Sequence, residues 1–261
     1  MKIVVLIKQV PDTTEVKLDP RTGTLIREGV PSIINPEDKN ALEEALKLKE
    51  QMGAQVIVLS MGPPQAEDAL REALAMGADE AILLTDRAFA GADTWATATT
   101  LGLALKKIGD FDLVLAGRQA IDGDTAQVGP QVAEYLKIPQ ITYVRELVIE
   151  DGKVRAKRAI EDGYEEIEAE LPALLTITKE ANTPRYPHAG AIMNAYRERK
   201  VIFWGVKDVD ANPEQVGLQG SPTQVRRSFS PPPKEPGQII KSGPAEAAKE
   251  LVAILRQKNI I

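Results

Sequence analysis

The sequence has 261 residues, a formal net charge of −6, 27% charged residues, 43% hydrophobic residues and no cysteine. This length suits one large α/β domain, or a smaller domain with an appendage. The negative charge argues against a nucleic-acid partner, because phosphate backbones favour basic surfaces. The lack of cysteine excludes disulfides and thiolate chemistry, and the single histidine, His188, argues against multi-histidine metal sites. We therefore expect a bound cofactor to supply any chemistry, with no metal.

The opening residues, MKIVVLIKQVPD, contain an apolar run over residues 3–7 that polar residues follow at once. A secretory signal needs a longer apolar core, and no stretch approaches the length of a membrane span. We expect no signal peptide, no transmembrane segment and a cytoplasmic location.

Strands and helices are expected to alternate through the first half of the chain. Residues 16–28 are expected to form a hairpin that turns at residues 19–23 (DPRTG). Continuous apolar runs predict buried strands at 3–7, 56–60, 81–85, 113–117 and 140–144. Helical spacing of apolar residues predicts helices from Asn35–Pro36 to Gly53, over 64–76, from Asp93 to about Ile108, and around 130–136. This alternation predicts an open, mostly parallel, doubly wound α/β sheet.

The pattern changes after residue 145. Polar and apolar residues alternate over 145–170, and Asp-Gly pairs stand at 151–152 and 162–163, which predicts antiparallel hairpins. The apolar run at 172–178 predicts a buried strand that returns to the sheet. We divide the chain into an α/β domain (1–183), a partner-recognition loop with a short helix (184–200), and a C-terminal arm (201–261) that ends in a helix over 244–258. The arm has too few apolar residues for its own core, so we expect it to pack on another subunit; packing on its own domain is the alternative.

Small polar residues follow several of the predicted strands. These segments are 8–12, 60–64, 90–94 and 118–129, and a helix start at 35–38 joins them. Ligands bind beyond the carboxyl ends of parallel strands, where backbone amides and helix starts hold phosphates. The chain has no GxGxxG after the first strand and no GxxxxGK[ST]. We interpret this edge as a nucleotide site of another kind.

The stretch 117–130, GRQAIDGDTAQVGP, divides by chemistry. Asp122 and Asp124 suit ribose hydroxyls or adenine amines, whereas Thr125, Gln127 and the amides of 125–129 suit phosphate. The alternative is that Asp124 caps the following helix, with Gln127 completing a capping box. Pro130 favours a helix that starts there and leaves 118–129 as a ligand loop.

Several motifs resemble the beta subunit of electron transfer flavoproteins. The signature-like stretch is 156–176, AKRAIEDGYEEIEAELPALLT. The further matches are IKQVPD (7–12), NP (35–36), SMGP (60–63), the 117–130 loop and TPRY (183–186). The resemblance spans nearly the whole chain and implies a Rossmann-like, adenine-nucleotide-binding sheet.

The resemblance also implies a cofactor and partners. The family pairs this subunit with an alpha subunit that carries one FAD. Simple members hold a structural AMP in the beta subunit, whereas bifurcating members hold a second FAD there. That FAD takes a hydride from NADH and sends electrons to ferredoxin or flavodoxin and, through the alpha-subunit FAD, to an acyl-CoA dehydrogenase-type partner. Segments 86–98 (DRAFAGADTWATA) and 60–68 (SMGPPQAED) resemble the bifurcating kind, so we favour FAD over AMP.

The resemblance transfers residue by residue to the cofactor site and to a docking loop. The implied cofactor-binding residues are Leu6, Asn35, Pro36, Glu37, Asp38, Ser60, Met61, Gly62, Ala92, Asp93, Thr94, Asp122, Gly123, Asp124, Thr125, Ala126, Gln127, Val128 and Gly129. The implied docking residues are Tyr186, His188, Ala189, Ile192 and Met193. Ala189 stands where the family often has a larger aliphatic anchor, which leaves the partner's identity open.

Several alternatives remain open, for single residues and for the function. Met61 can be a core residue, and Lys8 either steadies phosphate charge or is solvated. The chain can be a plain electron carrier with AMP, on which no hydride chemistry occurs. An ATP-cleaving enzyme of similar fold would need a glycine- and serine-rich loop where this chain has KQVPD, and a nucleotide sensor would not need the long arm.

Overall fold

The computed structural model describes residues 1–12, 31–226 and 236–261. The chain divides into two compact units, Met1–Arg226 and Arg227–Ile261. The hairpin expected at 16–28 lies outside the described residues.

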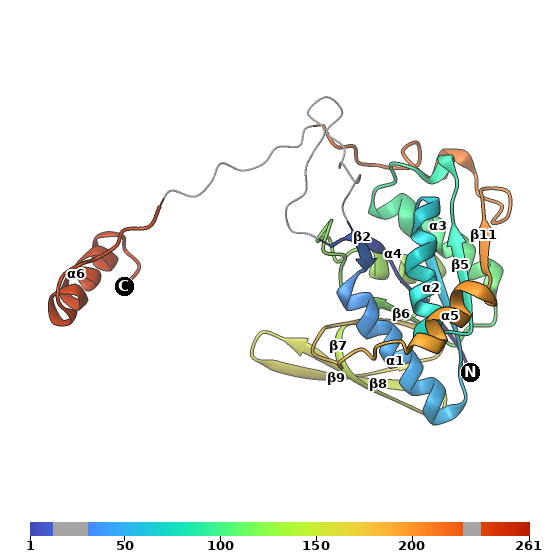
Figure 1. Ribbon diagram of the computed structural model, residues 1–261, viewed down its shortest axis with the longest axis horizontal. Helices are drawn as coiled ribbons and strands as arrows, with labels where there is room; N and C mark the ends of the chain where they lie inside the picture. Colours follow the sequence, from blue (N-terminus) through green and yellow to red (C-terminus); the bar gives the residue numbers. More distant parts are fainter. Residues whose placement is uncertain (13–30, 227–235) are drawn as a thin grey trace. The chain divides into compact units, whose positions relative to one another are not determined.

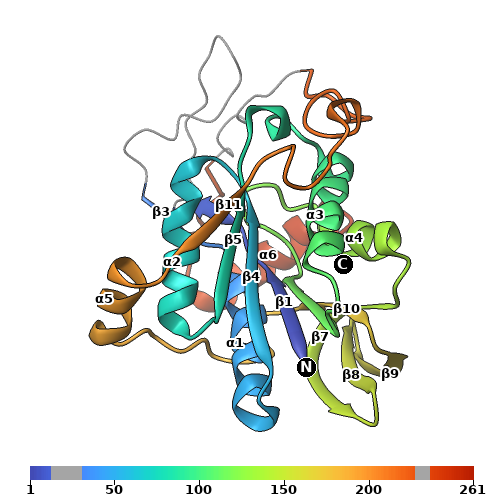
Figure 2. The same ribbon diagram turned by 90° about the vertical axis from the view of Figure 1, so that its right-hand side faces the viewer.

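A nine-stranded sheet organises the described part of the first unit, in the order β11-β5-β4-β1-β6-β10-β7-β8-β9 (Figures 1 and 2). The seven strands from β11 to β7 are parallel, and β8 and β9 continue the sheet as antiparallel hairpins. The strands are β1 (Lys2–Leu6), β4 (Gln55–Met61), β5 (Glu80–Leu84), β6 (Leu113–Gly117), β7 (Gln140–Glu150), β8 (Lys153–Ile160), β9 (Gly163–Glu170), β10 (Ala173–Ile177) and β11 (Val201–Trp204). The predicted α/β class and its mostly parallel sheet are confirmed.

Helices cover both faces of this sheet (Figure 2). One face carries α1 (Pro36–Met52) and α2 (Glu67–Met76), with α5 (Ala189–Arg197) packed on α2. The other face carries α3 (Thr94–Ile108) and α4 (Val128–Leu136). Alternation along each buried strand supplies both cores, because successive side chains point to opposite faces.

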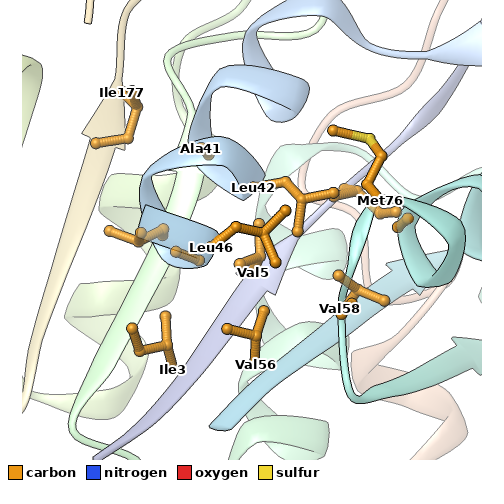
Figure 3. Close-up of a cluster of buried hydrophobic side chains, with 14 of the residues drawn as sticks. Ile3, Val5, Ala41, Leu42, Leu46, Val56, Val58, Met76 and Ile177 are labelled. Carbon is orange, nitrogen blue, oxygen red and sulfur yellow. The ribbon is translucent and has the colours of Figure 1, made fainter. Parts of the chain in front are cut away.

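The core under α1 shows how this alternation works (Figure 3). Ile3 and Val5 of β1 face Leu42 and Leu46 of α1, and all four side chains are at most 2% exposed. Each such side chain contributes about 1.5–3 kcal/mol by leaving water. Pro36 occupies the first position of α1 and Gly53, at φ 69°, ends it, as predicted.

Two predicted boundaries differ from the structure. Helix α4 begins at Val128, not Pro130, and Gln127 is its N-cap. Pro130 is accommodated because amides of the first helical turn have no partner within the helix. Residues Val201–Trp204, which we assigned to the arm, pair with β5 as the edge strand β11, and the first unit continues to Arg226.

Smaller elements complete the description. Strands β2 (Gln9–Pro11) and β3 (Ser32–Ile34) form an antiparallel pair, and single 3₁₀ turns are η1 (Pro64–Ala66), η2 (Arg87–Phe89) and η3 (Pro213–Gln215). Helix α6 (Pro244–Gln257) lies in the second unit, close to its predicted range. Among the residues that the structure describes, no helix combines the length and the apolar character that crossing a membrane requires.

Candidate functional site

The carboxyl edge of the sheet holds the candidate site. Strand β1 lies between β4 and β6, so the chain leaves it toward one side first and toward the other side later. Such a reversal of strand order opens a crevice beyond the carboxyl ends. Among the described residues, the loops after β1 and β6 bond the start of α1 there, through Asp38 and Glu37.

Asn35 joins two of these loops. It is fully buried and precedes α1, yet its side chain caps no amide of that helix. Its Nδ2 donates to the carbonyl of Gln119 at 2.8 Å, and its Oδ1 accepts from the amide of Ile121 at 3.0 Å. Its own amide donates to the carbonyl of Lys8 at 2.8 Å. Asn35 therefore fixes the ligand loop through backbone groups.

Glu37 holds the beginning of the same loop. Its Oε2 accepts from the amide of Gln119 at 3.0 Å, and its Oε1 pairs with the Arg118 guanidinium at 3.0 Å. The Glu37 side chain is 9% exposed, so both bonds are largely shielded from water. Pro36, in contrast, is exposed at the helix start.

Asp38 connects β1 to β6. Its Oδ2 accepts from the amide of Lys8 at 2.8 Å and its Oδ1 from the amide of Gly117 at 3.1 Å. Burial raises the pKa of Asp38 to about 7, although hydrogen bonds from Asn35 and the two amides, with the charge of Lys8, act to lower it. A Cβ at position 117 would lie 2.3 Å from this Oδ1, so only glycine fits there.

Lys8 does not stand free at the end of β1. Its Nζ lies 2.7 Å from Oδ1 of Asp122, whose side chain is 9% exposed. The pair ties the loop after β1 to the loop after β6. A lysine on this carboxylate also reduces the repulsion that Asp122 would exert on a bound phosphate.

The loop from Asp122 to Gln127 presents backbone amides. Asp124 and Ala126 both have φ of 52°, and Gln127 returns to a right-handed conformation. Alternation of this kind turns successive amides toward one side, which forms an anion-binding nest. No acceptor among the described residues engages the amides of residues 125–127. Asp124 is therefore part of the loop and does not cap α4, so the capping alternative is wrong.

The nest continues into the start of α4. No side chain caps the first turn of this helix, so its early amides add to the donors of the loop. Gly129 lets the turn approach the sheet, since a Cβ there would lie 2.7 Å from Cγ2 of Thr176. Gly123 lies in open space, and Thr125 is exposed while Val128 is half-buried.

The start of α3 adjoins this loop. Oγ1 of Thr94 donates to Oε1 of Gln127 at 3.1 Å, which brings the two helix starts together. Asp93 caps α3 through the amide of Ala96, as expected, and its other oxygen accepts from the amide and hydroxyl of Thr223. Burial acts to raise the pKa of Asp93, but these bonds outweigh it and lower the pKa. Both oxygens of the Asp93 carboxylate are therefore bonded to groups of the protein itself. Ala92, which precedes it, is half-buried.

The end of β4 supplies a further donor. Ser60 is 1% exposed, and its Oγ has no hydrogen-bond partner among the described residues. Gly62 follows closely packed, because a Cβ there would lie 3.0 Å from Cβ of Ala66. Met61 packs against the core shared with α3 and α4, which supports its structural role, and Leu6 is buried in β1.

The predicted docking residues form a separate exposed segment. Tyr186 is 95% exposed, Met193 51% and Ile192 41%. His188 precedes α5 as its N-cap, where Nδ1 accepts from the amide of Ala191 at 3.1 Å. Ala189 is exposed at the first helical position. The structure therefore keeps these residues together, in and just before α5, which packs on α2.

Arg185 attaches this segment to α1. Its Nε and Nη2 donate to both carboxylate oxygens of Glu43 at 2.9 Å, and its backbone amide donates to Glu43 as well. Beside it, Asn182 and Asn40 exchange hydrogen bonds between side chains and backbone carbonyls. Sequence reasoning assigned no role to Arg185, although it belongs to the quoted TPRY motif.

Sequence reasoning also missed Arg118 and Gln119. Both lie in the stretch 117–130, directly after a buried strand, so position alone pointed to them. Their partners were not visible, because Glu37 is 82 residues from Gln119 in sequence. Only the fold brings the start of α1 to the end of β6.

Known proteins resemble this chain over its full length. The family model described as an electron transfer flavoprotein domain matches residues 22–202. The chain is 60% identical to the caffeyl-CoA reductase-Etf complex subunit CarD of Acetobacterium woodii, over the full length of both chains. It is 58% and 55% identical to subunits named electron transfer flavoprotein subunit beta, from Thermoanaerobacterium thermosaccharolyticum and Clostridium acetobutylicum, again over the full length of both chains.

Proposed function

We propose a function from one premise: the chain belongs to the electron transfer flavoprotein family, as a beta subunit. In this proposal it pairs with an alpha subunit and binds FAD at the carboxyl edge of its sheet. NADH is its hydride donor. Electrons then pass to ferredoxin or flavodoxin and, through the alpha-subunit FAD, to an acyl-CoA dehydrogenase-type partner. The proposed location is the cytoplasm.

The observation that carries this proposal is the group of amides at 125–127, which bond no acceptor within 1–12, 31–226 and 236–261, beside the uncapped start of α4. A pyrophosphate offers several anionic oxygens, and neutral amides hold such oxygens without competing protons. The buried Ser60 hydroxyl is a further donor at the end of β4, on the other side of β1 from β6. These donors fit the adenine-dinucleotide half of FAD, and they fit AMP as well.

The residues of the chain divide the work of binding. The amides of 125–127, the Thr125 hydroxyl and the start of α4 hold the phosphates, and Asp122 and Asp124 lie in the same loop for ribose hydroxyls. FAD supplies the redox chemistry when bound. Asn35, Glu37 and Lys8 keep the loop in place through the contacts described above.

The similarity to the CarD subunit, whose name places it in a caffeyl-CoA reductase-Etf complex, supports a partner that acts on acyl-CoA substrates. The resemblance of segments 60–68 and 86–98 supports the bifurcating version. The alternative is a non-bifurcating subunit that holds a structural AMP and carries electrons between dehydrogenases and a quinone reductase. Exposed Tyr186, Ile192 and Met193 are the proposed contacts for the dehydrogenase in either version. Helix α6, which has no buried side chain among the described residues, is the proposed contact for the alpha subunit.

Cofactor counting tests this proposal. The chain is purified with its alpha subunit, ligands are released with acid, and FAD and AMP are quantified by chromatography. We expect about two FAD and no AMP per heterodimer, in line with the resemblance of segments 60–68 and 86–98 to the bifurcating kind. One FAD with one AMP would contradict the proposal and establish the alternative.

A pair of glycine variants locates the bound FAD. Gly129→Ala places a Cβ 2.7 Å from Thr176 and displaces the start of α4, so about one FAD should be lost. Gly163→Ala, in β9 and outside the proposed site, meets no atom within 4 Å and should retain both. Equal FAD content in the two variants would exclude this loop as the binding site.

A further inference from the structure

Asp38 is the only side chain among the described residues that bonds the backbones of both β6 and the loop after β1. Its two carboxylate oxygens accept separately, from the amide of Lys8 and from the amide of Gly117. These two amides lie where the loop after β1 and the loop after β6 begin. We propose that Asp38 is a proton-linked positioning residue: its ionised carboxylate holds both loops in the binding geometry, and protonation releases them. The inference rests on the proposed FAD site.

Opposing effects act on the ionisation of Asp38: burial favours the protonated form, whereas hydrogen bonds and the charge of Lys8 favour the ionised form. The residue is 7% exposed, and burial disfavours its charged form. Lys8, on the loop after β1, is the charged group that acts on it; Arg118 and Asp122 lie on the loop after β6, and Glu37 precedes it on α1. Lys8 is neutralised in part by Asp122, and Arg118 by Glu37. No neighbour therefore fixes the charge of Asp38, and its pKa of about 7 lies near neutrality.

The two protonation states differ in what they can hold. An ionised carboxylate accepts both amide bonds with charge assistance, which makes each bond shorter and stronger. A protonated carboxyl keeps one oxygen as a hydroxyl and loses that assistance on both sides. The loop after β1 and the loop after β6 are then less firmly joined. Loss of these two bonds displaces the amide nest, because the loop that carries the nest follows directly after Gly117.

This coupling gives FAD binding a defined pH dependence. Only the fraction of protein with ionised Asp38 is competent to bind, so apparent affinity falls with that fraction. With a pKa of about 7, binding at pH 8 should be about tenfold tighter than at pH 6. Binding at pH 7 should release about half a proton per FAD, since half of the free sites are protonated.

Calorimetry on the alpha–beta complex, freed of its nucleotides, tests the inference with FAD as the probe. FAD suits the experiment because its pyrophosphate lacks the phosphomonoester proton that titrates near about pH 6. Titrations at pH 7 in buffers of different ionisation enthalpy give the number of protons released. Two controls accompany the wild type. Asp38→Asn accepts at most one of the two amide bonds, and Asp110→Asn changes an exposed acid that precedes β6 at the opposite edge.

The wild type and Asp110→Asn should release about half a proton at pH 7 and lose about tenfold in affinity from pH 8 to pH 6. Asp38→Asn should bind weakly at every pH and release none from this position. Absence of proton release in the wild type, or an unchanged pH profile in Asp38→Asn, would overturn the inference.

Hydrogen exchange decides the inference without FAD and without a variant. In the wild type, the protection factors of the Lys8 and Gly117 amides should fall together as the pH drops from 8 to 6. Protection that stays constant over this range would contradict the role of Asp38. A wild type that binds no FAD would contradict the proposed function, while the exchange result still decides the inference.

Discussion

The start of α1 and the hairpin sheet β7–β9 both gather charged side chains, yet they use them differently. Glu37 and Asp38 are each 7% exposed and bond backbone amides from distant segments. On the outer face of β8 and β9, Lys153, Arg155 and Glu168 are 39–67% exposed and pair with one another across the strands. Water screens the second set and hardly reaches the first.

The difference shows which polar contacts determine geometry. A buried carboxylate that loses an amide partner is left without water to replace it, which costs about 1–3 kcal/mol. An exposed ion pair that loses a partner is rehydrated, and its net contribution is about 0–1 kcal/mol. The start of α1 is therefore expected to respond to small changes that the hairpin sheet tolerates.

Of the variants considered, Gly117→Ala should destabilise the protein most, because it disturbs the buried contacts at the start of α1. The added Cβ would lie 2.3 Å from Oδ1 of Asp38 and 2.7 Å from its backbone nitrogen, so backbone as well as side chain must move. We expect a loss of about 1–3 kcal/mol in the free energy of unfolding, measured with urea.

The matched control is Gly163→Ala in β9, where a Cβ meets no atom within 4 Å. Its free energy of unfolding should stay within about 0.5 kcal/mol of the wild type. Equal losses in the two glycine variants would show that the close packing at the start of α1 has no special role.

Arg185→Ala should have an intermediate effect. The side chain of Glu43 is 7% exposed, and removal of the guanidinium leaves its carboxylate buried without these partners. We expect about 1–2 kcal/mol of destabilisation, because the Arg185 side chain is 32% exposed and the backbone amide at 185 still donates to Glu43. Proteolysis between residues 183 and 188 should be faster. Arg185→Lys keeps the charge but loses the two-pronged bond, and should fall between the alanine variant and the wild type. Wild-type cleavage rates in both variants would argue against this attachment.

Glu168→Gln should have the smallest effect on stability, and it tests the weak contribution of the exposed ion pairs on β8 and β9. Lys153 first, and then Arg155, lower the pKa of Glu168 to about 2 by hydrogen bonding. The stabilisation from this group is thus present above the ordinary carboxylate pKa and is lost as pH falls from about 4.5 toward 2. At pH 7 and high salt, the variant and the wild type should have the same melting temperature. A large difference that persists in salt would contradict the screening argument.

Much of the fold was predictable because local patterns control it. The runs IVVL at β1 and LVLAG at β6 are apolar on both faces, which only a buried parallel strand requires. Pro36 and Gly53 marked the ends of α1 through backbone preferences that act locally. The strand β11 was missed because four residues at a sheet edge, two of them exposed, carry little pattern.

The site was predictable as a place and not as a set of contacts. Parallel strands bring their carboxyl ends together, so the segments that follow them had to meet. The sequence assigned Asp38 to the site but gave no sign that both of its oxygens bond backbone amides. It likewise gave no sign that Asp93 bonds Thr223, which lies 130 residues away.

The sequence by itself determined the parallel α/β sheet, the edge at which the site lies and the family resemblance, because apolar periodicity, glycine and proline positions, and short motifs are local properties. Tertiary structure alone decided that Asn35, Glu37 and Asp38 join the loops while the amides of 125–127 remain available. The physical reason is that hydrogen-bond partners are chosen by proximity and burial, and these exist only once distant segments have packed.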